Sequence, residues 1–323
     1  MTKRPVVVAT RHFPEAVEQR LQSMFDARLN PEDRALSHDE LVARAQGADG
    51  LMVAATGKVD ADLIHRLPAS IRIIATFSVG YEHIDIAAAE QRGILVTNTP
   101  DVLTDATAEI ALLLLLAAAR RAHEGAAMLR QDQWTGWTPT QLMGIGLTGK
   151  RLGIVGMGRI GQALAERARA NGMEIHYYNR TRLSPEQEKG AIHYATVEAL
   201  LPQAQFLSLH CPLTPQTVKL MDARRLALLP EGAVLINTAR GGIVDDEALI
   251  AALKSRRLAA AGLDVFDGEP KVDKRYFAIE NAFILPHMGS ATIETRNAMG
   301  FRAIENLQAV LIDGKAPPHR VKA

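Results

Sequence analysis

Short runs of β-branched and apolar residues alternate with longer helical stretches along nearly the whole chain. Parallel strands cannot be joined by a tight hairpin and need a crossover, which is usually a helix. Such an alternation is therefore typical of an α/β fold built on parallel sheets. In the N-terminal part the expected strands are residues 6–9, 50–54, 71–76 and 94–97, and helical periodicity is found in residues 16–24 and 38–45.

A second series of strands begins half-way along the chain. The expected strands are residues 152–155, 174–178, 206–209, 233–237, 260–265 and 283–285. Before them, residues 104–121 predict a long helix with Asp105 in its first turn and Arg120 and Arg121 in its last, as the helix dipole favours. Its positions 111–119 are almost all apolar, so it is expected to be buried on most sides.

The remaining segments set the expected domain boundary. Residues 131–149 hold both tryptophans and have no clear periodicity, which predicts an extended arm. Residues 292–313 are expected to form a helix, and residues 314–323 a polar tail. The 323 residues suggest two domains, at roughly 150 residues for each. The boundary is expected near residues 100–150.

Charge and cysteine content exclude several classes of protein. Lys and Arg number 37 against 36 Asp and Glu, so a net charge of +1 provides no electrostatic surface for nucleic acid or membranes. The single cysteine, Cys211, rules out an internal disulfide or an all-cysteine metal site and favours a reducing compartment. The longest apolar run, residues 110–119, is about half a membrane span. We expect a cytoplasmic protein that binds no metal, nucleic acid or membrane.

The sharpest local motif is Gly156-Met157-Gly158-Arg159-Ile160-Gly161, between an expected strand and an expected helix. In that context each glycine has a physical reason. Gly156 allows the tight turn, Gly158 lets a pyrophosphate approach the backbone, and Gly161 lets the helix pack on the strand. The helix N-terminus then favours the negative charge. The motif therefore predicts a dinucleotide site.

The following strand lacks the acid that binds the adenosine ribose of NAD. It ends in Tyr178-Asn179-Arg180-Thr181-Arg182, and residues 175–185 contain no Asp or Glu. A guanidinium can bind a 2′-phosphate through charge-assisted hydrogen bonds, and Arg180 and Arg182 are the candidates. The alternative is that both are solvated surface arginines. NADP(H) is favoured, and NAD(H) remains possible.

Three further segments place polar residues where strands end. They are residues 237–242 with Arg240, residues 264–270 with Glu269, and residues 286–290 with His287. Each of these side chains alone is more often structural than catalytic. Ligands of open α/β sheets bind beyond the carboxyl ends of the strands, so the three segments are expected to converge on the nicotinamide.

Together these motifs resemble those of the D-isomer-specific 2-hydroxyacid dehydrogenases. The resemblance covers the whole chain and includes FSVGYEHID at residues 77–85, NTPDVLTDATAE at 98–109, NTARGGIVDD at 237–246, LDVFDGEP at 263–270 and PHMGS at 286–290. SVGYEHID, the Trp134–Trp137 arm and Asn179-Arg180-Thr181 are most similar to the NADPH-dependent glyoxylate/hydroxypyruvate reductase branch.

The resemblance implies two Rossmann-like, doubly wound parallel-sheet domains, one inserted into the other. Residues 1–101 and 290–323 would form the substrate-binding domain, and residues 102–289 the dinucleotide-binding domain. It also implies a homodimer, with a dimerisation arm at about residues 121–149 that wraps the partner. Trp137 would then reach the neighbouring subunit's substrate pocket, although plain packing of the arm is an equal alternative.

The implied reaction is NADPH-dependent reduction of a small 2-oxo acid, such as glyoxylate or hydroxypyruvate, to the 2-hydroxy acid. His287 would be the general acid, Glu269 its carboxylate partner, and Arg240 the group that binds the substrate carboxylate and polarises the carbonyl. The backbone amides of Val79 and Gly80 would bind the carboxylate as well. Cys211 and His210 are expected to be structural. The expected cofactor contacts are Gly156, Gly158, Arg159, Ile160, Gly161, Asn179, Arg180, Thr181, Arg182, Cys211, Pro212, Thr238, Ala239, Asp264 and Gly289.

Other functions remain open at this point. One branch of the fold serves as nucleotide-sensing corepressors, but this chain keeps Arg240, Glu269 and His287 and has no basic patch. Phosphoglycerate dehydrogenase is disfavoured, because only residues 314–323 follow the last expected helix, although short versions exist. Formate and phosphite dehydrogenases share the fold, without evident matches to their special pocket residues. The residues do not rank the possible 2-oxo acids.

Overall fold

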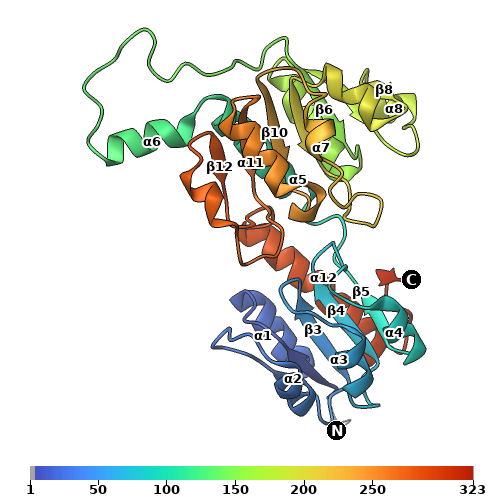
Figure 1. Cartoon of the computed structure of the whole chain (residues 1–323). Coiled ribbons are helices and arrows are strands. Elements are labelled where there is room, and N and C mark those ends of the chain that lie inside the picture. Colours follow the sequence, from blue (N-terminus) through green and yellow to red (C-terminus); the bar gives the residue numbers. More distant parts are fainter. Residues whose placement is uncertain (1–3, 323) are drawn as a thin grey trace. The chain divides into compact units, whose positions relative to one another are not determined.

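The computed structural model describes residues 4–322, and the chain divides into two compact units. Unit 1 comprises Met1–Leu103 with Ala291–Ala323, and unit 2 comprises Thr104–Ser290 (Figure 1). Unit 2 is therefore inserted into unit 1 along the chain. The boundaries between the units lie at residues 103/104 and 290/291. The resemblance had implied boundaries at 101/102 and 289/290, one or two residues earlier.

Unit 1 is built on a six-stranded sheet in the order β13-β5-β4-β3-β1-β2. Its strands are β1 (Val6–Ala9), β2 (Asp26–Arg28), β3 (Gly50–Ala54), β4 (Ile73–Phe77), β5 (Leu95–Thr97) and β13 (Arg320–Val321). Its helices are α1 (Glu15–Met24), α2 (His38–Arg44), α3 (Ala61–Arg66), α4 (Ile86–Gln91) and α12 (Ile293–Leu311). One core cluster joins the sheet to α1 and α12, and another joins it to α2, α3 and α4. The strands are parallel except for β13, which pairs antiparallel with β5.

Unit 2 is built on a seven-stranded, all-parallel sheet in the order β12-β11-β10-β9-β6-β7-β8. Its strands are β6 (Arg151–Val155), β7 (Glu174–Tyr178), β8 (Ile192–Tyr194), β9 (Phe206–Leu209), β10 (Ala233–Asn237), β11 (Leu258–Leu263) and β12 (Ala282–Ile284). Its α-helices are α5 (Thr104–Ala119), α6 (Ala122–Arg130), α7 (Arg159–Ala170), α8 (Pro185–Glu188), α9 (Val197–Leu200), α10 (Ala223–Leu226) and α11 (Asp246–Lys254), with short 3-10 turns at Leu201–Gln203, Gly241–Ile243 and Lys274–Ala278.

The order in which successive strands join the sheet reverses between β6 and β9, and that point decides where a ligand can bind. From β6 the sheet grows to β7 and β8 on one side, and to β9, β10, β11 and β12 on the other. Helices α5 and α7 pack on one face, whereas α9, α10 and α11 pack on the opposite face. The predicted doubly wound α/β class is thereby confirmed, and a crevice is expected beyond the carboxyl ends of β6 and β9.

Three details differ from the prediction. The helix over 104–121 ends at Ala119, and Arg121 adopts a left-handed φ of 52° before α6 begins, so the two arginines lie outside its last turn. Most of residues 111–119 are buried as expected, but Leu113 and Leu116 of α5 are 46% and 36% exposed. Residues 320–321 of the expected polar tail form a sheet strand, because their backbone pairs with β5.

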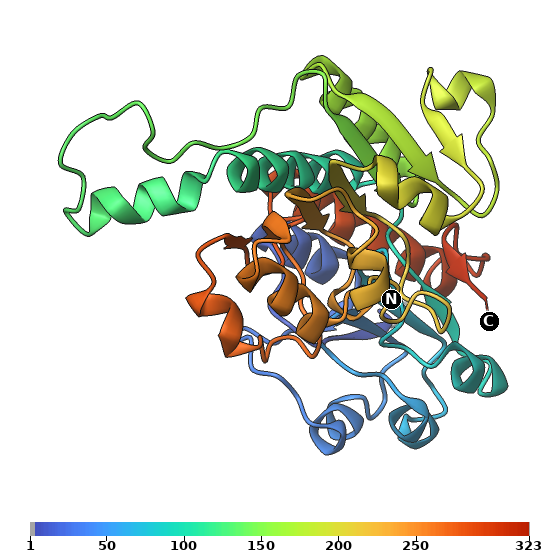
Figure 2. The same ribbon diagram turned by 45° about the horizontal axis from the view of Figure 1, so that its top comes forward.

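The expected arm, residues 131–149, contains no helix or strand and loops from the far end of α6 back toward β6 (Figure 2). The side chain of Trp137, in this arm, is 78% exposed. None of the helices in residues 4–322 combines the length and the apolar character needed to cross a bilayer.

Candidate active site

The glycine-rich turn joins β6 to α7, and its three glycines differ in their surroundings. Gly156 has a φ of +97°, and a Cβ there would lie 2.6 Å from the Cys211 backbone nitrogen. A Cβ at Gly161 would lie 2.5 Å from the Gly156 carbonyl oxygen. A Cβ at Gly158, in contrast, would meet open space beside the first turn of α7. The turn thus leaves unfilled room next to a helix N-terminus, which fits a pyrophosphate.

Asn179, at the end of β7, is tied to this turn. Its Oδ1 accepts a 2.7 Å hydrogen bond from the Met157 backbone N–H, the second residue of the motif. Arg180 is exposed, and in the described part of the chain its guanidinium has no hydrogen bond or ion pair. Arg182 instead donates to Glu188, with Nε at 2.8 Å and NH2 at 3.1 Å. Of the two candidate arginines, the structure leaves Arg180 available to a ligand.

His287 and Glu269 form a close pair beyond β12 and β11. His287 Nδ1 lies 2.7 Å from Glu269 Oε2, and Glu269 Oε1 accepts a 2.7 Å hydrogen bond from the Phe266 backbone N–H. The hydrogen bond with Glu269 raises the pKa of His287 above its ordinary value of 6.5, against the effects of burial and the nearby Arg240. Burial opposes ionisation of Glu269, but the hydrogen bonds from His287 and Phe266 outweigh it, so the pKa of Glu269 is lowered. An imidazolium–carboxylate pair is favoured.

A buried acid, Asp264, holds the loop that carries His287. Its Oδ1 and Oδ2 accept hydrogen bonds from the backbone N–H groups of Met288 at 2.6 Å and Gly289 at 2.8 Å. The Asp264 carbonyl accepts the His287 N–H at 2.9 Å, while His287 itself has a left-handed φ of 54°. Burial raises the pKa of Asp264, although the two amides oppose it. The strained conformation at His287 is thus stabilised by contacts on both sides.

Thr107 is a further support that the motifs did not single out. Its buried hydroxyl donates to the Gly289 carbonyl at 3.1 Å, from α5 across the unit. Thr107 lies inside the quoted segment 98–109, so the signal was present, but nothing in its local sequence indicated this partner.

Arg240 lies on the loop after β10, and Asn237 shapes that loop. The Asn237 side chain accepts from the Ala239 N–H at 3.0 Å and donates to the Arg240 carbonyl at 2.9 Å. A Cβ at Gly241 would lie 1.9 Å from the Phe266 carbonyl carbon, so this loop packs directly on the one that leads to Glu269. The positive charge of Arg240 is near enough to act on both groups: it contributes to the lowered pKa of Glu269 and partly opposes the raised pKa of His287. The structure therefore brings Arg240, Glu269 and His287 together.

The first two residues after β9, His210 and Cys211, are half-buried. Burial raises the pKa of the Cys211 thiol to about 11 and lowers the pKa of His210 to about 4. His210 Nε2 lies 2.8 Å from Ser208 Oγ, and its Nδ1 lies 3.5 Å from the hydroxyl of Thr238, which is itself buried. Neither Cys211 nor His210 is poised as a nucleophile or base, in line with a structural role.

Val79 and Gly80 belong to unit 1, in the loop after β4. The Val79 carbonyl accepts from Asn98 Nδ2 at 2.8 Å, and the Gly80 carbonyl accepts from Ser78 Oγ at 2.6 Å. Among residues 4–322, the N–H groups of Val79 and Gly80 have no hydrogen-bond acceptor. The loop therefore offers two amide donors, which suits a carboxylate.

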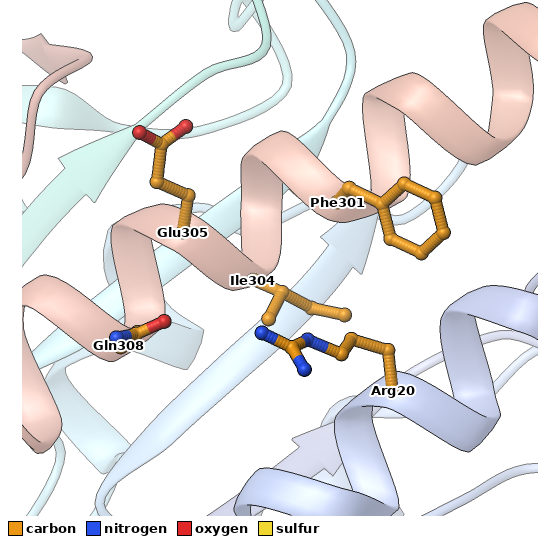
Figure 3. Close-up of a pocket in the computed structure, with 5 residues that line it drawn as sticks. All are labelled: Arg20, Phe301, Ile304, Glu305 and Gln308. Atoms are coloured by element: carbon orange, nitrogen blue, oxygen red, sulfur yellow. The ribbon is translucent and has the colours of Figure 1, made fainter.

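Two other features of unit 1 contain none of the predicted site residues. A hollow of about 410 Å³ lies between α1 and α12, lined by Arg20, Phe301, Ile304, Glu305 and Gln308 (Figure 3). Elsewhere His38, Asp60 and Asp62 lie close enough to hold a metal ion, but their carboxylates are engaged. Lys58 lies 3.4 Å from Asp60, and Arg66 lies 3.3 Å from Asp62.

Comparison with known proteins identifies the family. Residues 112–289 match the model of the D-isomer specific 2-hydroxyacid dehydrogenase, NAD binding domain. The chain belongs to the D-isomer specific 2-hydroxyacid dehydrogenases. It is 44% identical over 322 residues to a glyoxylate reductase of Thermococcus litoralis, which covers 98% of this chain and 97% of the relative. It is 41% identical to a glycerate dehydrogenase of Hyphomicrobium methylovorum, over 96% of this chain and 97% of the relative.

A solved structure of this dehydrogenase family extends the comparison to the fold. The NADPH-dependent glyoxylate/hydroxypyruvate reductase of Sinorhizobium meliloti, solved with NADP and malonate, superposes with a TM-score of 0.88 at 35% identity. The match covers 99% of this chain and all of the other. The two Rossmann-like units and the oxidoreductase class predicted from the motifs are thus confirmed, and the chain is a 2-hydroxyacid dehydrogenase that carries an NAD-binding domain.

Proposed function

We propose that this dehydrogenase uses NADPH to reduce a small 2-oxo acid, such as glyoxylate or hydroxypyruvate. The observation that carries the proposal is the 2.7 Å contact of His287 with Glu269, beside Arg240 and at the carboxyl ends of the unit 2 strands. Unit 2 would bind the dinucleotide and unit 1 would contribute to substrate binding. The names of the T. litoralis and H. methylovorum relatives support this substrate class.

The side chains suit the charge changes of that reaction. The bound nicotinamide supplies a hydride to the carbonyl carbon, and the carbonyl oxygen must then gain a proton. His287 donates it from Nε2, since Nδ1 is held by Glu269. Arg240 binds the substrate carboxylate through its planar fork and polarises the carbonyl before transfer. In unit 1, the amides of Val79 and Gly80 are proposed as donors to a substrate carboxylate. Glu269 keeps His287 charged until the proton leaves.

The cofactor preference rests on the residues after β7. The open space at Gly158 admits a pyrophosphate, and Asn179 and Arg180 present an amide and a guanidinium where an NAD enzyme has an acid. Arg180 would bind the 2′-phosphate, with Thr181 beside it. Thr238, Ala239, Asp264 and Gly289 would line the nicotinamide half, and Cys211 and Pro212 the adenosine half. The NADP-bound S. meliloti structure supports NADP as the class of cofactor.

A homodimer is proposed on the apolar surface of α5, α6 and the arm. Leu113, Leu116, Leu129, Trp137 and Met143 are exposed there in the single chain. Several exposed large apolar side chains on successive elements are typical of an association site. Analytical ultracentrifugation should show a dimer for the parent and a monomer for Leu113→Glu; a monomeric parent contradicts the assignment.

The decisive experiment is a steady-state screen of 2-oxo acids with both cofactors. We expect rapid oxidation of NADPH with glyoxylate or hydroxypyruvate, and slower oxidation of NADH. Binding of NADPH without turnover of any 2-oxo acid would instead indicate a nucleotide-sensing protein. Activity confined to 3-phosphohydroxypyruvate would indicate a phosphoglycerate dehydrogenase.

A further inference from the structure

The buried carboxylate of Glu188 contacts the segment that follows β7, residues 179–183. Its side chain is only 8% exposed. Glu188 Oε1 accepts hydrogen bonds from the Tyr177 hydroxyl at 2.5 Å and from Arg182 Nε at 2.8 Å, and Oε2 accepts from Arg182 NH2 at 3.1 Å. Tyr177 is fully buried, and its hydroxyl oxygen also accepts the Leu183 backbone N–H at 3.1 Å. The carboxylate is therefore well satisfied by groups that belong to one short segment.

Hydrogen bonds hold that segment, residues 179–183, at both ends. At its start Asn179 is hydrogen-bonded to the glycine-rich turn through Met157. At its end Leu183 is bonded to Tyr177, and Arg182 to Glu188. The two residues between these anchors, Arg180 and Thr181, are both exposed. Arg182 is exposed as well, with 66% of its side chain accessible, so the two nearby arginines differ in their contacts: the guanidinium of Arg182 is bound to Glu188, whereas that of Arg180 has no hydrogen bond or ion pair in the described part of the chain.

We propose that Glu188 is a positioning residue for cofactor choice, which holds Arg182 against Tyr177 so that Arg180 alone faces the 2′-phosphate. The inference rests on the proposed preference for NADPH. Glu188 lies six positions after Arg182 in the chain and outside the motifs that suggested the cofactor.

The energetics favour this arrangement over binding of the phosphate by Arg182. A two-bond guanidinium–carboxylate contact is among the strongest polar contacts in proteins. Arg182 and Tyr177 together lower the pKa of Glu188 to about 2, so the carboxylate is charged at any working pH. If Arg182 turned toward a ligand, a buried negative charge would lose its guanidinium partner, which is costly.

The test measures binding of two probes that differ only in the 2′-phosphate, adenosine 2′,5′-bisphosphate and adenosine 5′-monophosphate, by calorimetry. In Glu188→Gln the segment loses its ionic anchor, and affinity for the bisphosphate should fall by about tenfold. This loss is smaller than the full effect of removing a charge-assisted hydrogen bond, because Arg180 itself is still present. Affinity for the monophosphate should change less than about twofold. Arg182→Met should behave likewise, and the double variant should be no worse than either single one, because both changes break one contact.

The direction of the change in bisphosphate affinity distinguishes phosphate binding by Arg180 from phosphate binding by Arg182. If Arg182 binds the phosphate, Glu188→Gln frees it and raises the affinity for the bisphosphate, whereas Arg182→Met lowers it; this result overturns the proposal. Unchanged preference in both variants overturns it as well. If the parent binds both probes equally, the proposed NADPH preference itself is wrong, and the inference falls with it.

Two further variants guard against effects of misfolding. Tyr177→Phe removes one hydrogen bond from Glu188 without an unpaired charge, and should lower the bisphosphate affinity in the same direction by a smaller factor. Glu198→Gln is the matched control, because Glu198 pairs with Arg224 and Arg225 elsewhere in unit 2. It should leave the preference for the bisphosphate unchanged, and a comparable loss in Glu198→Gln would overturn the proposal.

Discussion

His287 Nδ1 lies 2.7 Å from Glu269 Oε2, and the other oxygen of that carboxylate is held by the Phe266 amide at 2.7 Å. The ring therefore has one nitrogen fixed by the protein and one, Nε2, left for a reaction. The pKa of His287 is raised and that of Glu269 is lowered, so the proton is held at the imidazole over the interval between them. A proton donor next to a hydride acceptor is what reduction of a carbonyl requires.

Replacement of His287 by Ala should lower turnover by about 10²- to 10⁴-fold, the usual contribution of a general acid. NADPH binding should remain within about twofold of the parent, since the imidazole is assigned to the substrate and not to the nucleotide. Stopped-flow measurement of the hydride step and titration of NADPH fluorescence report the two effects separately. Unchanged turnover in this variant removes His287 as the acid.

Glu269→Gln should change the pH dependence of reduction. The imidazolium is the active form, so the rate falls as the pH rises through the pKa of His287, which in the parent lies above 6.5. Without the carboxylate this pKa decreases, and the fall in rate should begin at a lower pH. Profiles of kcat/KM against pH for parent and variant provide the measurement. Coincident profiles would show that the pair does not control the acid.

Much of the fold was predictable, because buried parallel strands are continuous apolar runs. The limits of β1, β3, β7, β9 and β10 match the expected ranges. The short edge strands β2 and β8 were missed, since their residues are largely exposed or half-buried and lack a clear pattern. The break at Arg121 was missed because no glycine or proline marks it, and β13 because its partner β5 is distant in sequence.

In the candidate site, too, some features could be predicted from the sequence and others could not. Arg240, Glu269 and His287 were predictable as polar residues at strand ends. The contacts that hold them were not, because they join separate elements. Thr107 reaches Gly289 across the unit, and Asp264 binds the backbone beyond His287. Likewise, only the structure shows which of the two arginines, Arg180 or Arg182, is engaged, because that depends on Glu188.

Arg240→Ala should raise the KM for the 2-oxo acid and lower kcat as well. Loss of a charge-assisted contact corresponds to roughly 1.5–3 kcal/mol, or about ten- to over a hundredfold in kcat/KM. Arg240→Lys keeps the charge but not the planar fork, and should recover only part of the activity. Near-normal kcat/KM in the alanine variant contradicts the assignment of the substrate site.

Two adjacent glycines provide a matched pair for the loop that carries Arg240. A methyl group at Gly241 would overlap the Phe266 backbone at 1.9 Å, whereas at Gly242 its nearest neighbours lie at 3.4 Å, an ordinary contact. Gly241→Ala should therefore displace this loop or the Glu269 loop and lower both Tm and activity, while Gly242→Ala should retain both. Thermal unfolding and steady-state rates test the pair, and equal behaviour of the two variants refutes the packing argument.

Cofactor choice should depend on Arg180 and Asn179. Arg180→Met removes the exposed guanidinium and should raise the KM for NADPH by about ten- to over a hundredfold, with a much smaller change for NADH. Asn179→Asp keeps the oxygen that accepts the Met157 N–H, so the glycine-rich turn retains its anchor. It introduces a negative charge beside the 2′-phosphate, and repulsion should shift preference further toward NADH. Equal losses for the two cofactors in Arg180→Met, or a parent that uses NADH as efficiently as NADPH, would show that the adenosine ribose is recognised elsewhere.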